Sequence, residues 1–333
     1  MPRSERRLCR RNPILGEASE GPSRPSPSSM PGGVDLHAHT TASDGALAPR
    51  ELVRLAARHG VRVLAVTDHD STEGLPEALQ EATAHGIEIV PGLEINCDVP
   101  GSEIHVLGYY VDWRAEWFQD FLREQRTERA ARVHRIVERL TELGLPLTAE
   151  EVFAICKEGS PGRPHVAQAM VKRGYVKSVR EAFDRWLHAN GPANVPRRRL
   201  TPVEAVAVIR RAGGVPVFAH PGLADRDAII PELVEAGLAG IETFYPEHSA
   251  AQIQAYRQTC RRLGLVATGG SDYHGPHTGR ATTVGSPHVP LEVWEELKHK
   301  AHELKHPTHE SDKDTRGPRE SDPPPSIPGH PRP

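Results

Sequence analysis

The sequence predicts an α/β fold in which seven strands form a closed or nearly closed βα barrel. Short apolar runs alternate with helical patterns along most of the chain, as in a sheet wrapped by helices. Polar residues of metal-binding type stand at or just beyond the ends of these runs, at one predicted strand after another. An open doubly wound sheet would concentrate such residues at one crevice, whereas the strands of a barrel all end at one rim. The distribution therefore favours a barrel.

Seven apolar runs have the length of buried strands, and helical patterns follow most of them. The predicted strands are Val34–Leu36, Val63–Thr67, Glu88–Val90, Ile104–Tyr109, Val215–Ala219, Gly240–Phe244 and Val266–Gly269. The predicted helices between them are Pro49–His59, Leu75–His85, Thr201–Ala212 and Ala250–Leu263. Because helices separate most successive strands, we expect the strands to run parallel.

The alternation stops in the middle of the chain, between Trp113 and Pro196. Only helical patterns occur there: Glu116–Leu143, Ala149–Cys156, His165–Arg173 and Val179–Ala189. Prolines and glycines mark the turns between them. The sequence thus predicts a barrel in two parts, residues 31–112 and 197–304, with a helical insertion over its mouth at residues 113–196.

The two ends of the chain lack the patterns of folded protein. Residues 1–30 carry Arg, Ser and Pro without periodicity, and residues 305–333 have almost no aliphatic side chains. We expect both to be disordered tails. Met30 directly precedes the first strand, so our working hypothesis is that the residues before it are a translated upstream extension without a folded role.

Composition bears on the class of protein. A formal net charge of −3 gives no general attraction to polyanions. The four cysteines are scattered without C-x-x-C spacing, which favours reduced thiols. No segment approaches the roughly 20 apolar residues of a membrane span, and no secretory signal pattern is present. We expect a cytoplasmic protein that does not bind membranes, and the sequence implies no protein partner.

Histidines and carboxylates recur at the predicted strand ends. His37 and His39 lie two residues apart, so they leave the same face of a strand and can bind one ion together; Asp272 and His274 repeat this spacing. The predicted metal ligands are His37, His39, Asp44, His69, Glu94, His105, His220, Asp272 and His274. They exceed the needs of one ion, and closely spaced divalent cations are typical of enzymes that hydrolyse phosphate esters.

Single residues near these motifs have ordinary structural alternatives. Asp44 lies in a turn-forming loop and, taken alone, would be a turn or helix-capping aspartate. His105 lies inside a strand, where a lone histidine is usually a packed core residue, but Glu94 just upstream favours a ligand. Asp68 and Asp70 are candidates for holding ligand imidazoles by their second nitrogen. For Asp70, helix capping is an equal alternative.

A second group of candidate residues is cationic. In the first helix of the predicted insertion, the apolar stripe from Val133 to Leu140 extends back one turn onto Arg129 and Arg132, so both should point inward. Arg163 opens a later helix, where free backbone amides add to anion binding. Guanidinium groups match phosphate oxygens. Exposed helix charges are the common alternative for an arginine-rich helix.

The order of the motifs resembles that of the PHP (polymerase and histidinol phosphatase) family. The matching segments are H-x-H, S-D-G, T-D-H-D, G-L-E, I-H-V-L-G-Y, A-H-P and S-D-Y-H-G, within residues 33–290. The R-x-x-R pair Arg129 and Arg132 and the segment Gly162–His165 (G-R-P-H) resemble the branch of 3',5'-nucleoside bisphosphate phosphatases.

The resemblance implies a distorted (β/α)7 barrel with two or three divalent ions, foremost manganese. The implied ligand sets are His37, His39, Glu94 and Asp272 for one ion, Glu94, His105 and His220 for a second, and Asp44, His69 and His274 for a third. Mixed imidazole and carboxylate donors also accept iron or zinc, so the sequence does not fix the metal.

We therefore expect hydrolysis of a nucleotide phosphomonoester, with the 3'-phosphate of a nucleoside 3',5'-bisphosphate as the preferred target. The predicted catalytic residues are Asp272, His274 and His220, and the predicted substrate-binding residues are Arg129, Arg132, Arg163 and His165. The alternatives are a 5'-to-3' exonuclease on short RNA or DNA, a histidinol-phosphatase-like enzyme, an amidohydrolase, and a noncatalytic metal-binding regulatory module. The full set of ligands argues against the last.

Overall fold

The computed structural model describes residues 33–99, 101–156, 159–196, 200–276, 278 and 282–306. Apart from Lys305 and His306, the predicted tails at residues 1–30 and 305–333 lie outside the described residues. Seven strands pair into one sheet in chain order. They are β1 (Gly33–Asp35), β2 (Val61–Val66), β3 (Glu88–Val99), β4 (Ser102–Tyr109), β5 (Val215–Phe218), β6 (Gly240–Phe244) and β7 (Val266–Gly269). The prediction of a seven-stranded α/β fold is confirmed.

Strand β4 corrects the prediction of an all-parallel sheet. It pairs antiparallel with both β3 and β5, whereas the remaining neighbours are parallel. The predicted strand Glu88–Val90 was too short, since β3 continues to Val99 and returns as β4 after a connection too short for a helical crossover. Val106 pairs with Phe218, so His105 comes level with the residues that follow β5.

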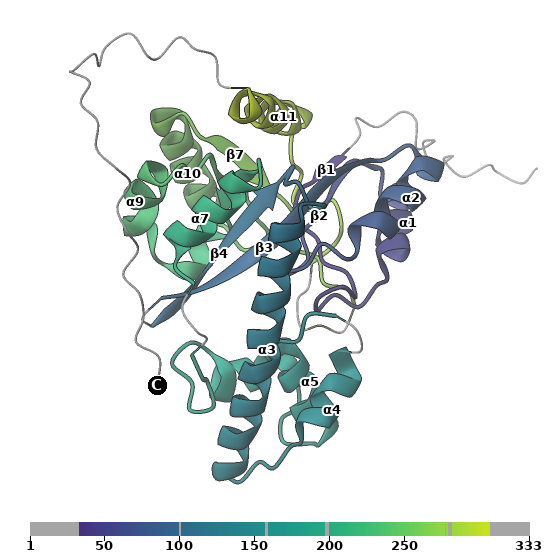
Figure 1. The fold of residues 1–333 in the computed structure, drawn as a ribbon, viewed down its shortest axis with the longest axis vertical. Helices are drawn as coiled ribbons and strands as arrows, with labels where there is room; N and C mark the ends of the chain where they lie inside the picture. The colour runs from purple at the N-terminus through teal and green to yellow at the C-terminus, as the bar shows by residue number, and fades with distance from the viewer. Residues whose placement is uncertain are drawn as a thin grey trace, which may run out of the picture. The chain divides into compact units, whose positions relative to one another are not determined.

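Helices cover the outer face of the sheet (Figure 1). Helices α1 (Pro49–Arg58) and α2 (Leu75–His85) contact β2 and β3, α7 (Pro202–Arg211) contacts β4 and β5, and α10 (Ala250–Leu263) contacts β6 and β7. The short helices α8 (Pro221–Ala224), η3 (Asp227–Ile229) and α9 (Ile230–Glu235) follow β5. Helix α7 starts with a capping box, in which Thr201 Oγ1 accepts from Glu204 N at 3.2 Å and Glu204 Oε2 accepts from Thr201 N at 2.8 Å.

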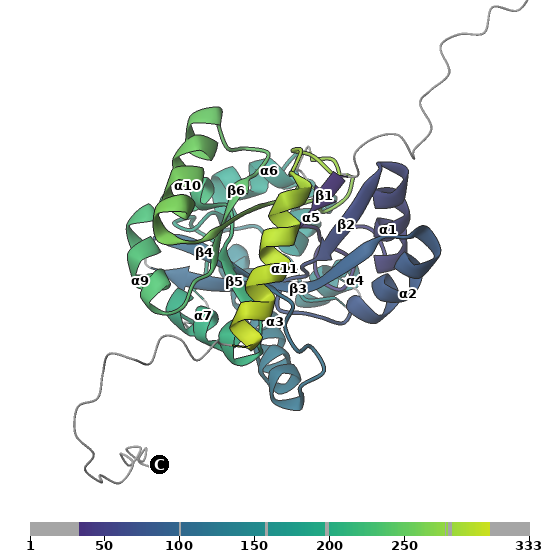
Figure 2. The same cartoon turned by 90° about the horizontal axis from the view of Figure 1, so that it is seen from above.

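Helix α11 (Leu291–Lys305) was not predicted, and it covers the inner face of the sheet (Figure 2). Val293, Leu297 and Ala301 are buried in one apolar cluster with residues from most of the strands. Within this core, the hydroxyl of Tyr109 on β4 donates to the backbone oxygen of Leu36 after β1, at 2.8 Å. These two strands are not neighbours in the sheet, so the sheet curls around its inner core.

The two edges of the sheet approach each other beyond β1 and β7. Leu36 N donates to Gly269 O at 3.1 Å, and an isolated parallel bridge joins Ala38 to Tyr273. A Cβ at Gly270 would lie 2.3 Å from His37 N, so only glycine allows this approach. Among the described residues no continuous ladder joins β1 to β7.

The first five helices after β4 have an apolar core of their own. They are α3 (Glu116–Glu142), α4 (Ala149–Cys156), α5 (Arg163–Lys172), α6 (Val179–Ala182) and the π-helix η2 (Phe183–Leu187). The predicted helix Val179–Ala189 is helical as far as Leu187, and its second part is the π-helix η2. Helix α3 joins both cores, because Leu122 packs with the sheet and Val133 packs with α4 and α5. Arg129 and Arg132 lie between these two residues and are buried, as the apolar stripe predicted.

Candidate metal centre

The structure brings all nine predicted metal-binding side chains into one largely buried cluster. Eight of them form three overlapping groups whose donor atoms lie within 4.8 Å of one another: His39, Asp44, His69 and His274; His37, His39, Glu94 and Asp272; and His69, Glu94 and His105. The ninth, His220, places Nε2 3.0 Å from Glu94 Oε1. We call these nine side chains the His/carboxylate cluster.

Glu94 lies at the centre of the cluster. Its Oε2 faces ring nitrogens of His37, His39 and His69 at 3.3, 3.2 and 3.1 Å. Its Oε1 faces His105 Nδ1 at 2.8 Å and His220 Nε2 at 3.0 Å. The two oxygens thus face two different sets of imidazoles, which is the geometry of a carboxylate that can bridge two cations.

The group around His37 and His39 has the spacing of a coordination sphere. Their Nε2 atoms are 3.1 Å apart, and Asp272 Oδ1 lies 3.3 and 3.2 Å from them. Donor atoms about 3.0–3.4 Å apart are neighbours around a cation held at about 2.1 Å. Two ring nitrogens that face each other this closely repel unless a proton or a cation lies between them. The donor set therefore fits a divalent metal ion.

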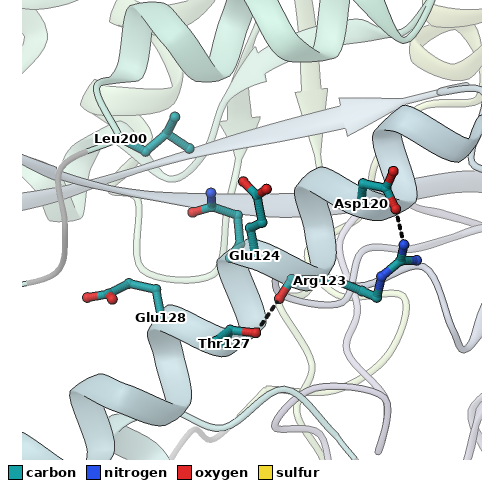
Figure 3. Close-up of a pocket in the computed structure, with 7 residues that line it drawn as sticks. Asp120, Arg123, Glu124, Thr127, Glu128 and Leu200 are labelled. Carbon is teal, nitrogen blue, oxygen red and sulfur yellow. Dashed lines mark hydrogen bonds and ion pairs between the residues drawn. The ribbon is translucent and has the colours of Figure 1, made fainter. Parts of the chain in front are cut away.

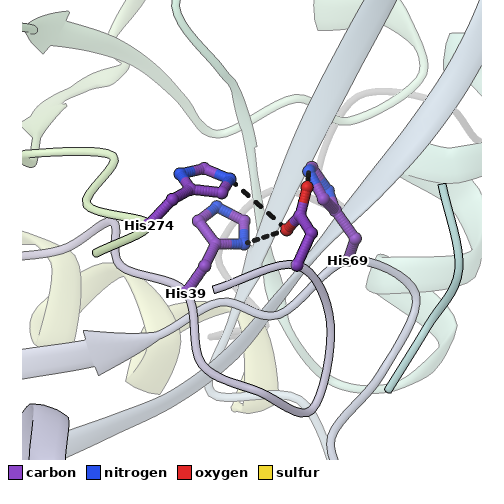
Figure 4. Close-up of side chains that lie close together, drawn as sticks. His39, His69 and His274 are labelled. Atoms are coloured by element: carbon purple, nitrogen blue, oxygen red, sulfur yellow. Dashed lines mark ion pairs between the residues drawn. The ribbon is translucent and has the colours of Figure 1, made fainter. Parts of the chain in front are cut away.

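A second group surrounds Asp44 (Figure 4). Its Oδ1 lies 3.4 Å from His274 Nε2 and 3.8 Å from His39 Nδ1, and its Oδ2 lies 3.8 Å from His69 Nε2. These distances exceed those of ordinary hydrogen bonds. His274 Nε2 is buried without a hydrogen-bond partner. Lone-pair donors that converge across such gaps fit a cation. The group contains the implied third ligand set and adds His39 to it.

The protonation states of His39, His69 and Glu94 suit metal binding. Burial, with a smaller effect from His274, lowers the pKa of His39 to about 4, and burial holds the pKa of His69 well below its usual range. Burial favours the neutral form of Glu94, but the imidazoles of His69 and His105 outweigh it and hold the pKa of Glu94 well below its usual range. Neutral imidazoles and ionised carboxylates are the forms that bind metals.

Glu242 on β6 is a member of the site that the sequence analysis missed. Its Oε1 lies 2.9 Å from His37 Nδ1, and its Oε2 accepts from the backbone N–H of His220 at 2.8 Å. Burial disfavours the charged His37 imidazole, but Glu242 and then Glu94 outweigh it and raise the pKa of His37 to about 10. The feature of the sequence that could have identified Glu242 is a lone glutamate within a short buried strand. Tyr245 was also missed; its hydroxyl donates to Asp272 Oδ2 at 2.9 Å.

Asp68 binds a loop, so the prediction that it holds an imidazole is wrong. Its Oδ1 accepts from Thr40 N and Ser43 Oγ, and its Oδ2 accepts from Thr40 Oγ1, all at 2.7 Å. The turn after His39 folds back onto the end of β2 and brings these donors to Asp68. Asp68 therefore fixes the turn that carries Asp44 into the cluster.

Three residues of the site have left-handed backbone conformations without being glycine. Asp70, His220 and Asp272 have φ values of 49°, 30° and 48°. Such conformations cost about 1–3 kcal/mol each and gather at functional sites. At His220 and Asp272 they lie just beyond the ends of β5 and β7, where the chain turns and the side chains enter the cluster.

The three predicted substrate-binding arginines line one cavity beside the cluster. This cavity, of about 90 Å³, is lined by Asp44, His69 and His105 of the cluster and by Arg129, Arg132 and Arg163, among others. Arg129 Nε donates to Asp70 Oδ2 at 2.6 Å, and its Nη2 donates to Asn96 Oδ1. Asn96 Nδ2 lies 2.7 Å from His105 Nε2, so Asn96 connects Arg129 to the cluster. Asn96 is the third residue of the site that the sequence analysis missed. We call this space the arginine cavity.

Arg132 and Arg163 share one carboxylate, that of Glu103. Arg132 Nη1 and Nη2 each lie 3.3 Å from Glu103 Oε1, and Arg163 Nη2 donates to Glu103 Oε2. Burial favours the neutral carboxyl group, but Arg163 and then Arg132 outweigh it and hold the pKa of Glu103 well below its usual range. The arginine cavity therefore contains an ionised carboxylate of the protein itself.

His165 lines a different cavity from the three arginines. Its Nδ1 accepts from Gly162 N at 3.1 Å at the start of α5. The neighbouring cavity, of about 180 Å³, is lined by His165, Gln168, Ser43 and Asp44, among others. The structure thus places His165 near the cluster through Asp44.

A larger hollow lies on the outer face of α3 (Figure 3). Its volume is about 910 Å³, and its lining includes Asp120, Glu124, Glu128 and Arg123. Arg123 is paired with Asp120. The excess of carboxylates opposes a phosphate, and none of the nine cluster residues lines this hollow. The chemistry therefore belongs to the His/carboxylate cluster.

Comparison with known proteins supports this assignment. The PHP domain model matches residues 35–158, which contain six of the nine cluster residues. The chain is 33% identical over 249 residues to 5'-3' exoribonuclease Rnm of Salmonella typhimurium, covering 73% of this chain and 85% of the relative. It is 31% identical over 274 residues to 3',5'-nucleoside bisphosphate phosphatase of Chromobacterium violaceum, covering 80% of this chain and 96% of the relative. The chain belongs to the PHP family.

Further relatives of this PHP protein also act on phosphate esters. It is 34% identical over 256 residues to phosphoribosyl 1,2-cyclic phosphate 1,2-diphosphodiesterase of Eggerthella lenta, covering 74% of this chain and 97% of the relative. The crystal structure of a proposed metal-dependent phosphoesterase from Bifidobacterium adolescentis superposes on this protein with a TM-score of 0.73 at 30% identity. The match covers 81% of this chain and 96% of that structure's chain. This PHP protein is a metal-dependent hydrolase of phosphoester bonds, so the noncatalytic alternative falls away. None of the described helices has the length and apolar character needed to cross a membrane.

Proposed function

We propose that this PHP protein hydrolyses the 3'-phosphate of nucleoside 3',5'-bisphosphates. The observation that carries the proposal is the arginine cavity, which adjoins the cluster through Asp44, His69 and His105. A substrate with two phosphates can place the reacting one at the cluster and the other at the arginines. The relative from Chromobacterium violaceum bears the name of this activity.

The nine cluster residues are the proposed metal ligands, in the three sets that the family resemblance implies. Divalent cations, with manganese as first choice and iron or zinc as alternatives, supply a nucleophile from water near neutral pH and neutralise charge on the phosphate. In the reaction a water oxygen bonds to phosphorus, and the bond from phosphorus to the 3' oxygen breaks to release an alcohol. Asp272, His274 and His220 are the proposed catalytic residues facing that phosphate.

The rest of the proposal concerns the scaffold. The curled sheet is proposed to be a distorted (β/α)7 barrel, which is supported by the contacts between the ends of β1 and β7. The helices from α3 to η2 are proposed to be an insertion over its mouth, at residues 113–196. Their contribution is Arg129, Arg132 and Arg163, which fix the second phosphate and so set the length of the substrate.

Replacing Arg129 with alanine tests the role of the arginines. Because a hydrogen bond to a charged group contributes about 1.5–3 kcal/mol, KM for a nucleoside 3',5'-bisphosphate should rise about tenfold or more. KM for p-nitrophenyl phosphate, which has no second phosphate, should change far less. Arg135→Ala is the matched control, since Arg135 lies on the same helix and pairs with Glu128 outside the cavity. Equal changes in KM for both substrates would contradict the role.

A second candidate activity is supported by the exoribonuclease relatives. At 33% and 32% identity, relatives from Salmonella typhimurium and Escherichia coli are named 5'-3' exoribonuclease Rnm. The arginine cavity suits any second phosphate, including one within an oligonucleotide. Release of nucleotides from short 5'-phosphorylated RNA, measured beside release of phosphate from bisphosphates with manganese present, separates the two activities.

A further inference from the structure

We propose that Glu103 is a specificity-determining residue, which competes with the second anionic group of the substrate for Arg132 and Arg163. The inference rests on the proposed function, because it concerns the group that these arginines bind. The carboxylate of Glu103 is then an anion of the protein itself, which the substrate must displace from the arginine cavity.

The position of Glu103 places its carboxylate inside the arginine cavity. Glu103 lies on β4 two residues before His105, so both side chains leave the same face of the strand. Its side chain is only 16% exposed, and it lines the cavity together with both arginines. Three N–H groups of Arg132 and Arg163 point at its two oxygens. These are donors that a phosphate in the cavity needs.

The two arginines are held in place by other contacts as well. Arg132 Nε donates to Val195 O at 2.7 Å, and its Nη2 donates to Asn194 Oδ1 at 3.1 Å. Arg163 Nη1 donates to Leu187 O at 2.8 Å. Because a backbone oxygen holds each side chain and an amide also holds Arg132, we expect the arginines to keep their places when the charge of Glu103 is removed. Glu103 is thus a competitor for the guanidinium groups and not their support.

Competition of this kind discriminates between substrates. A phosphate monoester offers three acceptor oxygens and up to two negative charges, whereas the carboxylate offers two oxygens and one charge. A phosphate can therefore exchange with Glu103, while a neutral group leaves the contacts of Glu103 intact and gains nothing from the arginines. Glu103 weakens the binding of second groups that must displace it and excludes those that are weakly anionic.

Replacing Glu103 with glutamine tests the inference, because it removes the charge and nearly keeps the shape. The probe is adenosine 5'-monophosphate, which has a single phosphate for the arginines to bind. With the manganese-loaded full-length protein, its dissociation constant from isothermal titration calorimetry should fall about tenfold, equivalent to about 1.4 kcal/mol. Glu128→Gln, which removes a carboxylate paired with Arg135 outside the cavity, should leave the constant unchanged.

A double-mutant cycle with Arg132→Ala locates the effect. The gain from Glu103→Gln should become smaller when Arg132 is absent, since the phosphate then lacks the two N–H groups of Arg132 that Glu103 released and keeps only that of Arg163. Equal or weaker binding by Glu103→Gln overturns the inference and makes Glu103 a support of the arginines. A gain of undiminished size in the double variant also overturns it.

Two further measurements keep the test decisive. If circular dichroism shows that Glu103→Gln does not fold, Glu103→Asp takes its place. This variant retains the charge on a shorter side chain, so it should tighten the binding of adenosine 5'-monophosphate by a smaller factor. Unchanged binding by Glu103→Asp would then overturn the inference. Hydrolysis of nucleoside 3',5'-bisphosphates by the wild-type protein decides the proposed function independently. If the wild-type protein does not hydrolyse these bisphosphates, the proposed function fails, but the calorimetric result on Glu103 can still be interpreted.

Discussion

At the scale of single residues, Glu242 determines how two proposed ligands are presented. One of its oxygens holds His37 Nδ1, which leaves His37 Nε2 directed at the cluster, and the other holds the backbone of His220. His220 has a left-handed backbone with φ of 30°, a conformation that needs support from its surroundings. Outer carboxylates that orient ligand imidazoles typically change metal affinity by 10–100-fold when they are replaced.

Replacing Glu242 with glutamine should therefore weaken manganese binding by about tenfold or more. The amide cannot accept hydrogen bonds with both of its terminal atoms, so either His37 or His220 loses its partner. The measurement is the dissociation constant for Mn²⁺ from calorimetric titration, together with metal content by mass spectrometry. Glu247→Gln, an exposed position five residues along, is the matched control. Equal metal affinity in both variants would show that Glu242 has no orienting role.

The convergence of the nine side chains of the cluster was predictable because residue type and position in the strand pattern agree. His37 and His39 share a face by spacing alone, and six strand ends repeat the same chemistry. Glu242, Tyr245 and Asn96 were not predictable in this way, because each acts through a contact between strands that are distant in sequence. Asp68 was misread for a related reason, since the turn that folds back onto it is a tertiary feature.

At the scale of elements, the reversal of β4 and the helix α11 are the main departures from the sequence prediction. The apolar pattern of a strand does not record its direction, so β4 was taken as parallel. His105 still reaches the cluster, because the start of an antiparallel strand lies at the edge where parallel strands end. Helix α11 was missed because only three buried apolar side chains, four residues apart, mark its inner face in a charged segment.

Replacing Leu297 with alanine tests the role of α11 in the inner core. Leu297 is fully buried, so the change should lower the free energy of unfolding by about 2–5 kcal/mol, through lost burial and the cavity left behind. Glu295→Ala, an exposed position on the same helix, should change it by less than about 0.5 kcal/mol. Urea unfolding followed by circular dichroism measures both. Similar losses at the two positions would mean that α11 does not pack as described.

At the scale of the whole molecule, one cluster ties together six of the seven strands. Its residues follow β1, β2, β5 and β7 or lie within β3 and β4, and they include three carboxylates, Asp44, Glu94 and Asp272. The apolar pattern predicted the α/β class, but it does not record how far a sheet curls. The contacts between the ends of β1 and β7 come from residues around Gly270 that no apolar periodicity marks.

Metal binding should therefore stabilise the whole fold. A ligand that binds only the folded state contributes about 2.7 kcal/mol when its free concentration is 100 times its dissociation constant. For a domain of this size each kcal/mol raises Tm by about 2–4 °C, so manganese added to chelator-treated protein should raise Tm by about 5–10 °C. Differential scanning calorimetry of the full-length protein measures this shift.

The variant Glu94→Gln provides the control for that measurement. It removes the carboxylate whose two oxygens face the two sets of imidazoles, so the rise in Tm on adding manganese should become much smaller. Glu128→Gln, outside the cluster, should keep the full rise. Because folding joins donors from six strands, an ion held by them must favour the folded state. A wild-type protein whose Tm does not respond to manganese, iron or zinc would show that the cluster holds none of them.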